Sequence, residues 1–168
     1  MVFYYSATGH TRTFADILAK ATGLPVYALE ADLDPAQKFG FFVKGAVSGI
    51  AKKPIPLAHE AEAFAALASA EGHEIYLCGP VWAGQPAGPL RYFLQKATLT
   101  GKVVHLLLTC ASLYGFEKYR ANGEKLLDAT DCVPGRVEIF IAVDPLDTAI
   151  IEEHIRILFL GETPPNPS

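Results

Sequence analysis

The chain alternates short, almost wholly apolar runs with longer segments in which apolar residues recur at helical spacing. Short apolar runs are typical of strands covered on both faces, and the helical spacing is typical of amphipathic helices. We expect strands at residues 2–5, 26–29, 75–78, 103–109 and 137–143. We expect helices at residues 11–21, 58–70, about 89–97, about 116–129 and 146–159.

Strands that alternate with helices predict an α/β fold, a parallel sheet with helices on both faces joined by right-handed crossovers. Ligands of such sheets bind beyond the carboxyl ends of the strands, where the order of winding reverses. The loops after the first, third and fourth strands are therefore the candidates for function. We expect residues 1–160 to form one domain and residues 161–168 to form a flexible tail.

The segment 30–73 is the least readable part of the chain. Phe39, Phe41 and Phe42 give way to glycines and prolines before any clean period returns. We expect a short helical or irregular excursion there. With the basic residues 52–53, these rings could cover a ligand or receive a partner, but a buried helix with a solvated basic end is the favoured interpretation.

Composition excludes several classes of protein. Of the 168 residues, 51% are hydrophobic and 19% charged, which supports a buried core and argues against disorder. The net charge of -4 repels phosphate backbones and anionic lipids, so we expect neither nucleic-acid nor membrane partners. No apolar run approaches the ~20 residues that span a bilayer, and the first strand has no targeting segment before it. These features favour a cytoplasmic protein.

The cysteines and histidines indicate neither a disulfide framework nor a metal site. Cys78, Cys110 and Cys132 are odd in number and lack C-x-x-C spacing, so we expect reduced thiols. The histidines show no metal-ligand spacing. Cys110 follows the most apolar strand, where packing is a commoner role for a free cysteine than redox chemistry.

The loop Ser6-Ala7-Thr8-Gly9-His10-Thr11 places three hydroxyl groups and a glycine at the start of the first helix. Free backbone N–H groups and the positive end of the helix dipole favour an anion there. One hydroxyl could simply cap the helix, but three tilt the interpretation towards a bound phosphate. An exposed His10 is more often a bystander than a ligand.

Missing motifs narrow the chemistry of this loop. The chain has no G-x-x-x-x-G-K-[ST] and no G-x-G-x-x-G after a strand, so neither a nucleoside triphosphatase loop nor a dinucleotide fingerprint is present. The loop also lacks the cysteine with which a thiol phosphatase attacks phosphorus. The remaining interpretation is a phosphate that is held and not cleaved.

Two aromatic residues follow neighbouring strands of the predicted sheet. Trp82, the only tryptophan, comes after the third strand, and Tyr114 comes after the fourth. Either ring alone could plug the end of the sheet with no ligand. Together with the hydroxyl loop, the two rings favour a slot for a flat conjugated ring. The sequence therefore indicates a phosphorylated aromatic cofactor.

These motifs resemble the flavodoxin family. The loop at residues 6–11 is similar to its [ST]-x-T-G-x-T signature, and LCGPVWAGQPAGPLRYFL and TGKVVHLLLTCASLYG resemble its two ring-binding segments. FGFFVKGAVSGIAKKPIPL is similar to the segment before the second helix in some bacterial relatives. The resemblance covers nearly the whole chain and implies a doubly wound, three-layer sandwich with a five-stranded parallel sheet in the order 2-1-3-4-5.

The resemblance implies noncovalently bound FMN, with no metal and no catalytic residue. It places a first group of residues around the phosphate: Ser6, Ala7, Thr8, Gly9, His10 and Thr11. It places a second group around the ring: Pro80, Val81, Trp82, Ala83, Gly84, Thr109, Cys110, Ala111, Ser112, Tyr114 and Gly115. A backbone carbonyl between Gly79 and Ala83 would tune the flavin.

The resemblance favours an electron-transfer protein that works with redox protein partners, as a monomer or homodimer. An NAD(P)H-dependent FMN or quinone reductase on the same fold is the alternative, and a binding module without cofactor is a third class. Electron carriers of the family usually have several carboxylates near the ring, whereas Glu117 is the only carboxylate in the two ring-binding loops here. This departure argues against a very low reduction potential and against a strongly basic partner.

Overall fold

A computed structural model describes residues 1–31, 49–111, 114–142 and 147–161 of the chain. The strands in order are β1 (Val2–Tyr4), β2 (Val26–Ala28), β3 (Glu74–Trp82), β4 (Gln85–Pro86), β5 (Val103–Cys110) and β6 (Val133–Ile141). The helices that lie wholly within these residues are α1 (His10–Thr22), α3 (Glu60–Ala68), α4 (Gly88–Lys96), α5 (Phe116–Asp128) and α6 (Thr148–Leu160). None of these helices is long and apolar enough to cross a membrane.

The main sheet is parallel and has the order β2-β1-β3-β5-β6. This order confirms the predicted 2-1-3-4-5 arrangement, because the two-residue β4 lies off the path and pairs antiparallel with the end of β3. The strands at both edges of the sheet run in the same direction as the central ones. All the strands of the main sheet therefore end at one edge of the molecule.

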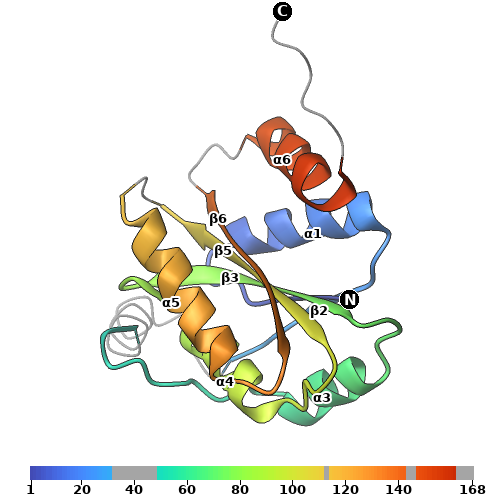
Figure 1. Cartoon of the computed structure of the whole chain (residues 1–168), viewed down its shortest axis with the longest axis vertical. Coiled ribbons are helices and arrows are strands. Elements are labelled where there is room, and N and C mark those ends of the chain that lie inside the picture. The colour runs from blue at the N-terminus through green and yellow to red at the C-terminus, as the bar shows by residue number, and fades with distance from the viewer. Residues whose placement is uncertain (32–48, 112–113, 143–146, 162–168) are drawn as a thin grey trace, which may run out of the picture.

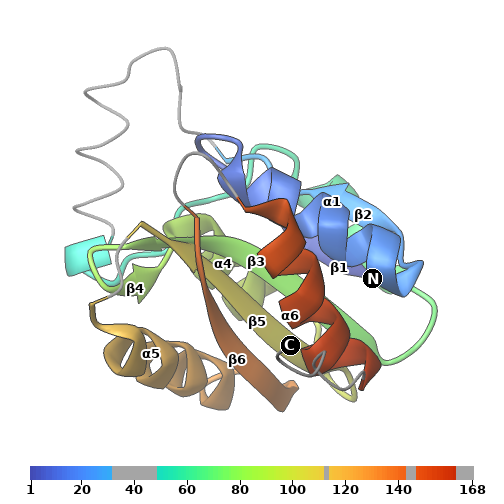
Figure 2. The same ribbon diagram turned by 90° about the horizontal axis from the view of Figure 1, so that it is seen from above.

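Helices cover both faces of the sheet, as Figures 1 and 2 show. On one face, Phe14 and Leu18 of α1 and Ile151 and Ile155 of α6 bury a smaller apolar cluster. On the other face, α3, α4 and α5 bury the larger cluster. The predicted doubly wound sandwich of three layers is confirmed.

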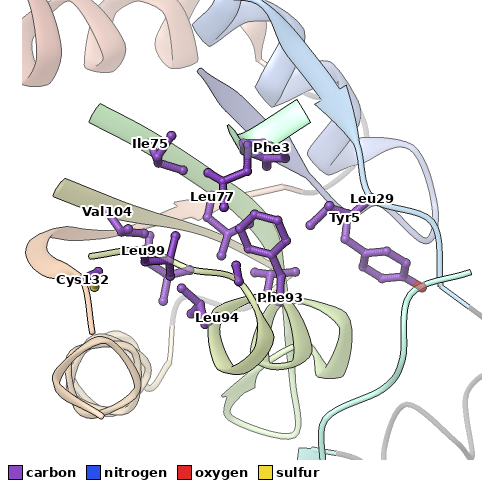
Figure 3. Packing of buried hydrophobic residues seen from close by; sticks show 14 of the residues in the cluster. Phe3, Tyr5, Leu29, Ile75, Leu77, Phe93, Leu94, Leu99, Val104 and Cys132 are labelled. Atoms are coloured by element: carbon purple, nitrogen blue, oxygen red, sulfur yellow. The ribbon is translucent and has the colours of Figure 1, made fainter. Parts of the chain in front are cut away.

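Alternating side chains of the central strands divide the core between these two clusters. Leu77 of β3 packs with the larger cluster, whereas its neighbours Tyr76 and Cys78 pack with the smaller one. In the larger cluster Phe3 lies against Phe93 of α4 with ring centroids 4.9 Å apart (Figure 3). Both sides of β3 are therefore anchored, which fixes the position of the loop that follows it.

Several predicted boundaries were wrong. The third strand does not stop at residue 78 but continues to Trp82, and the fifth begins at Val133 instead of residue 137. The helix predicted at 58–70 is shorter, Glu60–Ala68. The excursion predicted around Phe39, Phe41 and Phe42 and most of the predicted tail lie outside the described residues.

The first residues of β6 pair irregularly beside a histidine in the neighbouring strand. The pairing of β5 with β6 shifts register between Val104 and Leu106, and a Cβ added to Gly135 would lie 2.7 Å from His105 Nδ1. The backbone N–H of Arg136 donates to that same nitrogen at 3.0 Å. The irregularity makes room for the buried imidazole ring. The pattern of apolar residues in the sequence does not indicate such a shift in register.

His105 is held in its neutral form. Its Nδ1 accepts a hydrogen bond, so protonation there would set two N–H groups against each other. Its ring stacks on Tyr76 at 4.9 Å, and Glu74 Oε1 lies 3.9 Å from Nε2. Burial lowers the pKa of His105 below its ordinary value, against the smaller opposing effect of Glu74.

This geometry predicts a loss of stability in acid. The unfolded chain binds a proton at His105 below pH 6.5 while the folded chain stays neutral, so the free energy of unfolding falls as the pH drops from there towards the lowered folded pKa. Urea unfolding at a series of pH values measures this slope. His105→Gln should flatten it, whereas His154→Gln, which removes an exposed histidine, should not; equal slopes in all three proteins would contradict the prediction.

Candidate cofactor site at the carboxyl edge of the sheet

The candidate site lies where β1, β3 and β5 end. β1 pairs with β3 so that Tyr4 lies beside Cys78, and β3 pairs with β5 so that Pro80 lies beside Thr109. The backbone N–H of Tyr5 donates to the Cys78 carbonyl oxygen at 2.9 Å, which continues the pairing to the start of the hydroxyl loop. Parallel pairing therefore brings the three predicted loops to the same edge.

The hydroxyl loop turns sharply into α1. The N–H of Gly9 donates to Ser6 Oγ at 3.1 Å, and Thr8 Oγ1 lies 2.9 Å from His10 Nδ1. Gly9 is the N-cap residue with a φ of 99°, so it has no side chain with which to cap the helix. The start of α1 therefore has no side-chain cap and follows the exposed Thr8 and Gly9, at the positive end of the helix dipole.

The third hydroxyl of the loop has a structural partner. Thr11 is 3% exposed, and its Oγ1 lies 2.8 Å from Thr109 Oγ1 at the end of β5. This bond ties the start of α1 to the strand that leads towards Tyr114. The Thr11 side chain thus positions the loop, while Ser6 and Thr8 carry the two hydroxyls that lie nearer the surface.

Trp82 ends β3 at a tight turn. Trp82 pairs with Gln85 of β4, and the two residues between them, Ala83 and Gly84, have φ values of 48° and 79°. Two successive positive φ values are those of a type I′ hairpin turn. The sequence predicts only a loop at these residues, because alanine does not indicate a left-handed backbone conformation.

The indole ring lies beside the residue that precedes the hydroxyl loop. Trp82 meets Tyr5 edge-on, with ring centroids 5.6 Å apart and an interplanar angle of 90°. Burial raises the pKa of the Tyr5 phenol to about 12, so it stays neutral. Tyr5 lies at the border of the larger cluster in Figure 3. Because Ser6 follows Tyr5 directly, the indole and the hydroxyl loop share one edge of the molecule.

Helix α5 supports the Trp82 turn from one side. Asn122 Nδ2 donates to the Gly84 carbonyl oxygen at 2.8 Å. A Cβ added to Gly84 would lie 3.7 Å from Tyr119 Cε1 and 3.8 Å from Lys118 Nζ. Sequence reasoning missed Lys118, Tyr119 and Asn122, because only the packing of α5 against β4 brings them to the site.

The segment from Gly49 supports the turn from the other side. A Cβ added to Gly49 would lie 2.3 Å from the Trp82 carbonyl oxygen, so the backbone approaches more closely than any other residue would allow. Farther along, Arg91 Nη2 donates to the Lys53 carbonyl oxygen at 2.6 Å. Burial lowers the pKa of the Arg91 guanidinium to about 10, which leaves it charged at neutral pH.

The remaining predicted residues follow β5. Cys110 is buried at the end of the strand, and Ala111 is exposed beyond it. Tyr114 is 86% exposed, and Gly115, with a φ of 92°, begins α5. Ser112 lies outside the described residues. The two predicted rings therefore follow adjacent strands but differ in environment, since Trp82 is partly buried and Tyr114 stands in solvent.

The described loop residues of this edge offer mainly polar, uncharged groups, and Lys118 of α5 lies beside them. Residues 6–11, 80–87, 109–111 and 114–115 contain no carboxylate. Among the described residues no group of three histidine, cysteine or carboxylate side chains could hold a metal ion. Burial raises the pKa of the Cys78 thiol, which lies inside the sheet and is unreactive there. The described residues of the site offer hydroxyls, a helix N-terminus and an indole, which are groups with which proteins bind anions and flat rings.

Comparison with known proteins identifies the fold. No family model and no curated protein sequence matches the chain. It is similar to a candidate flavoprotein from Bacteroides uniformis, with a TM-score of 0.69, 19% identity and coverage of 93% of this chain and 96% of that one. It is also similar to a flavoprotein from Lactobacillus acidophilus NCFM in complex with FMN, with a TM-score of 0.59, 17% identity and coverage of 82% of this chain and 90% of that one. A third similar structure is a flavodoxin from Streptococcus pneumonia TIGR4, with a TM-score of 0.52, 17% identity and coverage of 96% of this chain and 97% of that one. The chain therefore has the flavodoxin-like fold.

The turn at Ala83 gives a direct test of the local geometry. A non-glycine residue in the left-handed region costs about 1–2 kcal/mol, and asparagine is the residue that type I′ turns favour before glycine. Ala83→Asn should raise the free energy of unfolding by about 0.5–1 kcal/mol in denaturant titration. Ala83→Val should lower it, because a β-branched residue fits this conformation worst. A destabilising Ala83→Asn together with a neutral Ala83→Val would contradict the turn.

Proposed function

We propose that the chain binds FMN noncovalently at the carboxyl edge of its sheet and transfers electrons through it. The observation that carries this proposal is the contact of Trp82 with Tyr5, the residue before the hydroxyl loop, so that an aromatic ring and the start of α1, which has no side-chain cap, follow neighbouring strand ends. The flavodoxin-like fold and the FMN complex of the Lactobacillus acidophilus flavoprotein support it.

The hydroxyl loop fits the phosphate of FMN. The exposed Thr8 and the partly buried Ser6 supply hydroxyl donors, and the first turn of α1 supplies N–H groups without a side-chain cap. A phosphate at this place gains hydrogen bonds to a charged acceptor together with the helix dipole. Thr11 would contribute its backbone N–H only, since its side chain is 3% exposed and its hydroxyl is buried against Thr109.

The turn at residues 82–85 and the start of α5 fit the ring of FMN. Trp82 supplies an aromatic surface, and Tyr114, which is largely exposed, stands on the neighbouring loop where it could cover the other face. The rigid I′ turn, bonded to Asn122, presents its backbone without side-chain bulk. FMN would supply the redox chemistry, and the protein would bind it, exclude water from one face and set its electrostatics.

A fluorescence titration with FMN tests the proposal. Trp82 is the only tryptophan, so stacking of the flavin should quench the whole tryptophan emission of the protein and the emission of the flavin. A chain that leaves both emissions unchanged after incubation with excess FMN does not bind it. That result would leave the fold intact and remove the proposed function.

Comparing FMN with riboflavin separates the two halves of the site. Riboflavin has the same ring as FMN but lacks the phosphate. Thr8→Val should therefore weaken FMN binding by roughly 10-fold or more, which corresponds to the loss of one hydrogen bond to a charged group. The same variant should leave riboflavin binding unchanged. Trp82→Leu should weaken the binding of both. Thr22→Val, which removes a hydroxyl at the far end of α1, is the matched control. A Thr8→Val protein that loses riboflavin and FMN equally would contradict the assignment of the phosphate.

Mixing the FMN-loaded protein with NADPH distinguishes an electron carrier from a reductase. An electron carrier should keep its flavin absorbance, because the sequence has neither an arginine-rich segment for a 2′-phosphate nor a dinucleotide fingerprint. Rapid bleaching in the absence of any other protein would favour an NAD(P)H-dependent reductase and contradict the carrier. Both outcomes keep FMN as the cofactor.

A further inference from the structure

We propose that Lys118 biases the site towards the reduced, negatively charged form of the flavin, so that this chain is a better electron acceptor than an acidic flavodoxin. The inference rests on the proposed function, because it concerns the same site. It assigns a role to a residue outside the loops that resemble the flavodoxin family. Two-electron reduction of FMN with uptake of one proton places one negative charge on the ring, and a nearby cation stabilises that charge.

Lys118 lies at the turn that would meet the ring. Its Nζ would lie 3.8 Å from a Cβ added to Gly84, and the neighbouring Tyr119 and Asn122 hold the same turn. The lysine is exposed, and none of the ion pairs among the described residues involves it. Its charge is therefore not neutralised by a carboxylate in the described part of the chain.

The position of Lys118 in its helix is locally unfavourable. It is the third residue of α5, in the first turn of a 13-residue helix, where the positive end of the helix dipole disfavours a cation. Lysines that serve helix stability lie in the last turn, as Lys125 does. The charge of Lys118 and the dipole of α5 add to each other at the turn, and helix stability does not account for this arrangement.

The surroundings contain little that would cancel this potential. Residues 6–11, 80–87, 109–111 and 114–115 carry no carboxylate, and Glu117, the one acid of the ring loops, is exposed and directly precedes Lys118. Successive helical residues point about 100° apart, so Glu117 and Lys118 face different directions. The start of α1 adds a second positive helix end at the same edge. The site thus combines positive electrostatic contributions, whereas acidic loops would disfavour the reduced ring.

The test is the affinity of the protein for FMN before and after reduction with dithionite. The ratio of the two dissociation constants, oxidised over reduced, equals the bias of the site, and a tenfold change in this ratio shifts a two-electron potential by about 30 mV. Lys118→Gln should lower the ratio by about 3- to 10-fold, in line with an exposed charge near the ring. Lys118→Glu should lower it further, and Lys118→Arg should keep it.

Lys125→Gln is the matched control. It removes the same charge from the same face of α5, seven residues and roughly 10 Å farther along the helix, and should leave the ratio unchanged. The difference between wild type and Lys118→Gln should shrink in about 1 M salt, where the Debye length is about 3 Å. A loss of packing alone would not respond to salt.

The outcomes separate this inference from the proposed function. Binding of both forms of FMN with the same ratio in wild type and Lys118→Glu would overturn the role of Lys118 and leave FMN binding in place. An equal effect of Lys125→Gln would also overturn it, since net charge and not position would then set the bias. A wild-type chain that binds neither form would overturn the proposed function and this inference with it.

Discussion

Parallel pairing places Tyr4 beside Cys78 and Pro80 beside Thr109, so the chain leaves β1, β3 and β5 at one edge of the sheet. Every other feature of the site depends on this register. It brings Tyr5 against Trp82 of β3 and Thr11 against Thr109 of β5, two contacts that hold the hydroxyl loop and the start of α1 to these strands. A one-residue slip would turn these side chains to the opposite face. The apolar packing of β3 and β5 therefore determines where the hydroxyl groups of the loop at residues 6–11 lie.

The sequence predicted the parts of this arrangement that have a local signal. Buried parallel strands read as apolar runs, and the loop at residues 6–11 combines hydroxyls with the start of a helix, so the alternation of strands and helices and the place of this loop could be predicted from the residues. The order of the strands followed only from the resemblance to the flavodoxin family. The continuation of β3 to Trp82 could not. Gly79, Pro80 and Gly84 punctuate the sequence like a loop. The segment is a strand because its first half pairs with β5 and its last two residues pair with β4.

The parts that the sequence did not predict depend on contacts between distant segments. Asn122 and Lys118 lie on an ordinary amphipathic helix, and nothing in their spacing points to Gly84, 38 residues before Asn122. Gly49 has no signal beyond its identity, yet its lack of a side chain allows the backbone to approach the Trp82 carbonyl oxygen. His105 similarly shifts the register of β6 through a bond to Arg136. Burial and hydrogen bonding, not propensity, decide these positions.

Two residues at the turn after Trp82 have locally unfavourable positions, one in its backbone conformation and one in its charge. Ala83 takes a left-handed conformation that glycine or asparagine would adopt at less cost, and Lys118 stands at the positive end of its own helix. Local costs of this kind concentrate where a protein acts on something other than itself. A small, uncharged side chain at residue 83 leaves the turn open to a flat ring, and under the proposed function Lys118 would place its charge beside that ring. The turn at which these two local costs meet is thus the one that a redox-active ring would contact.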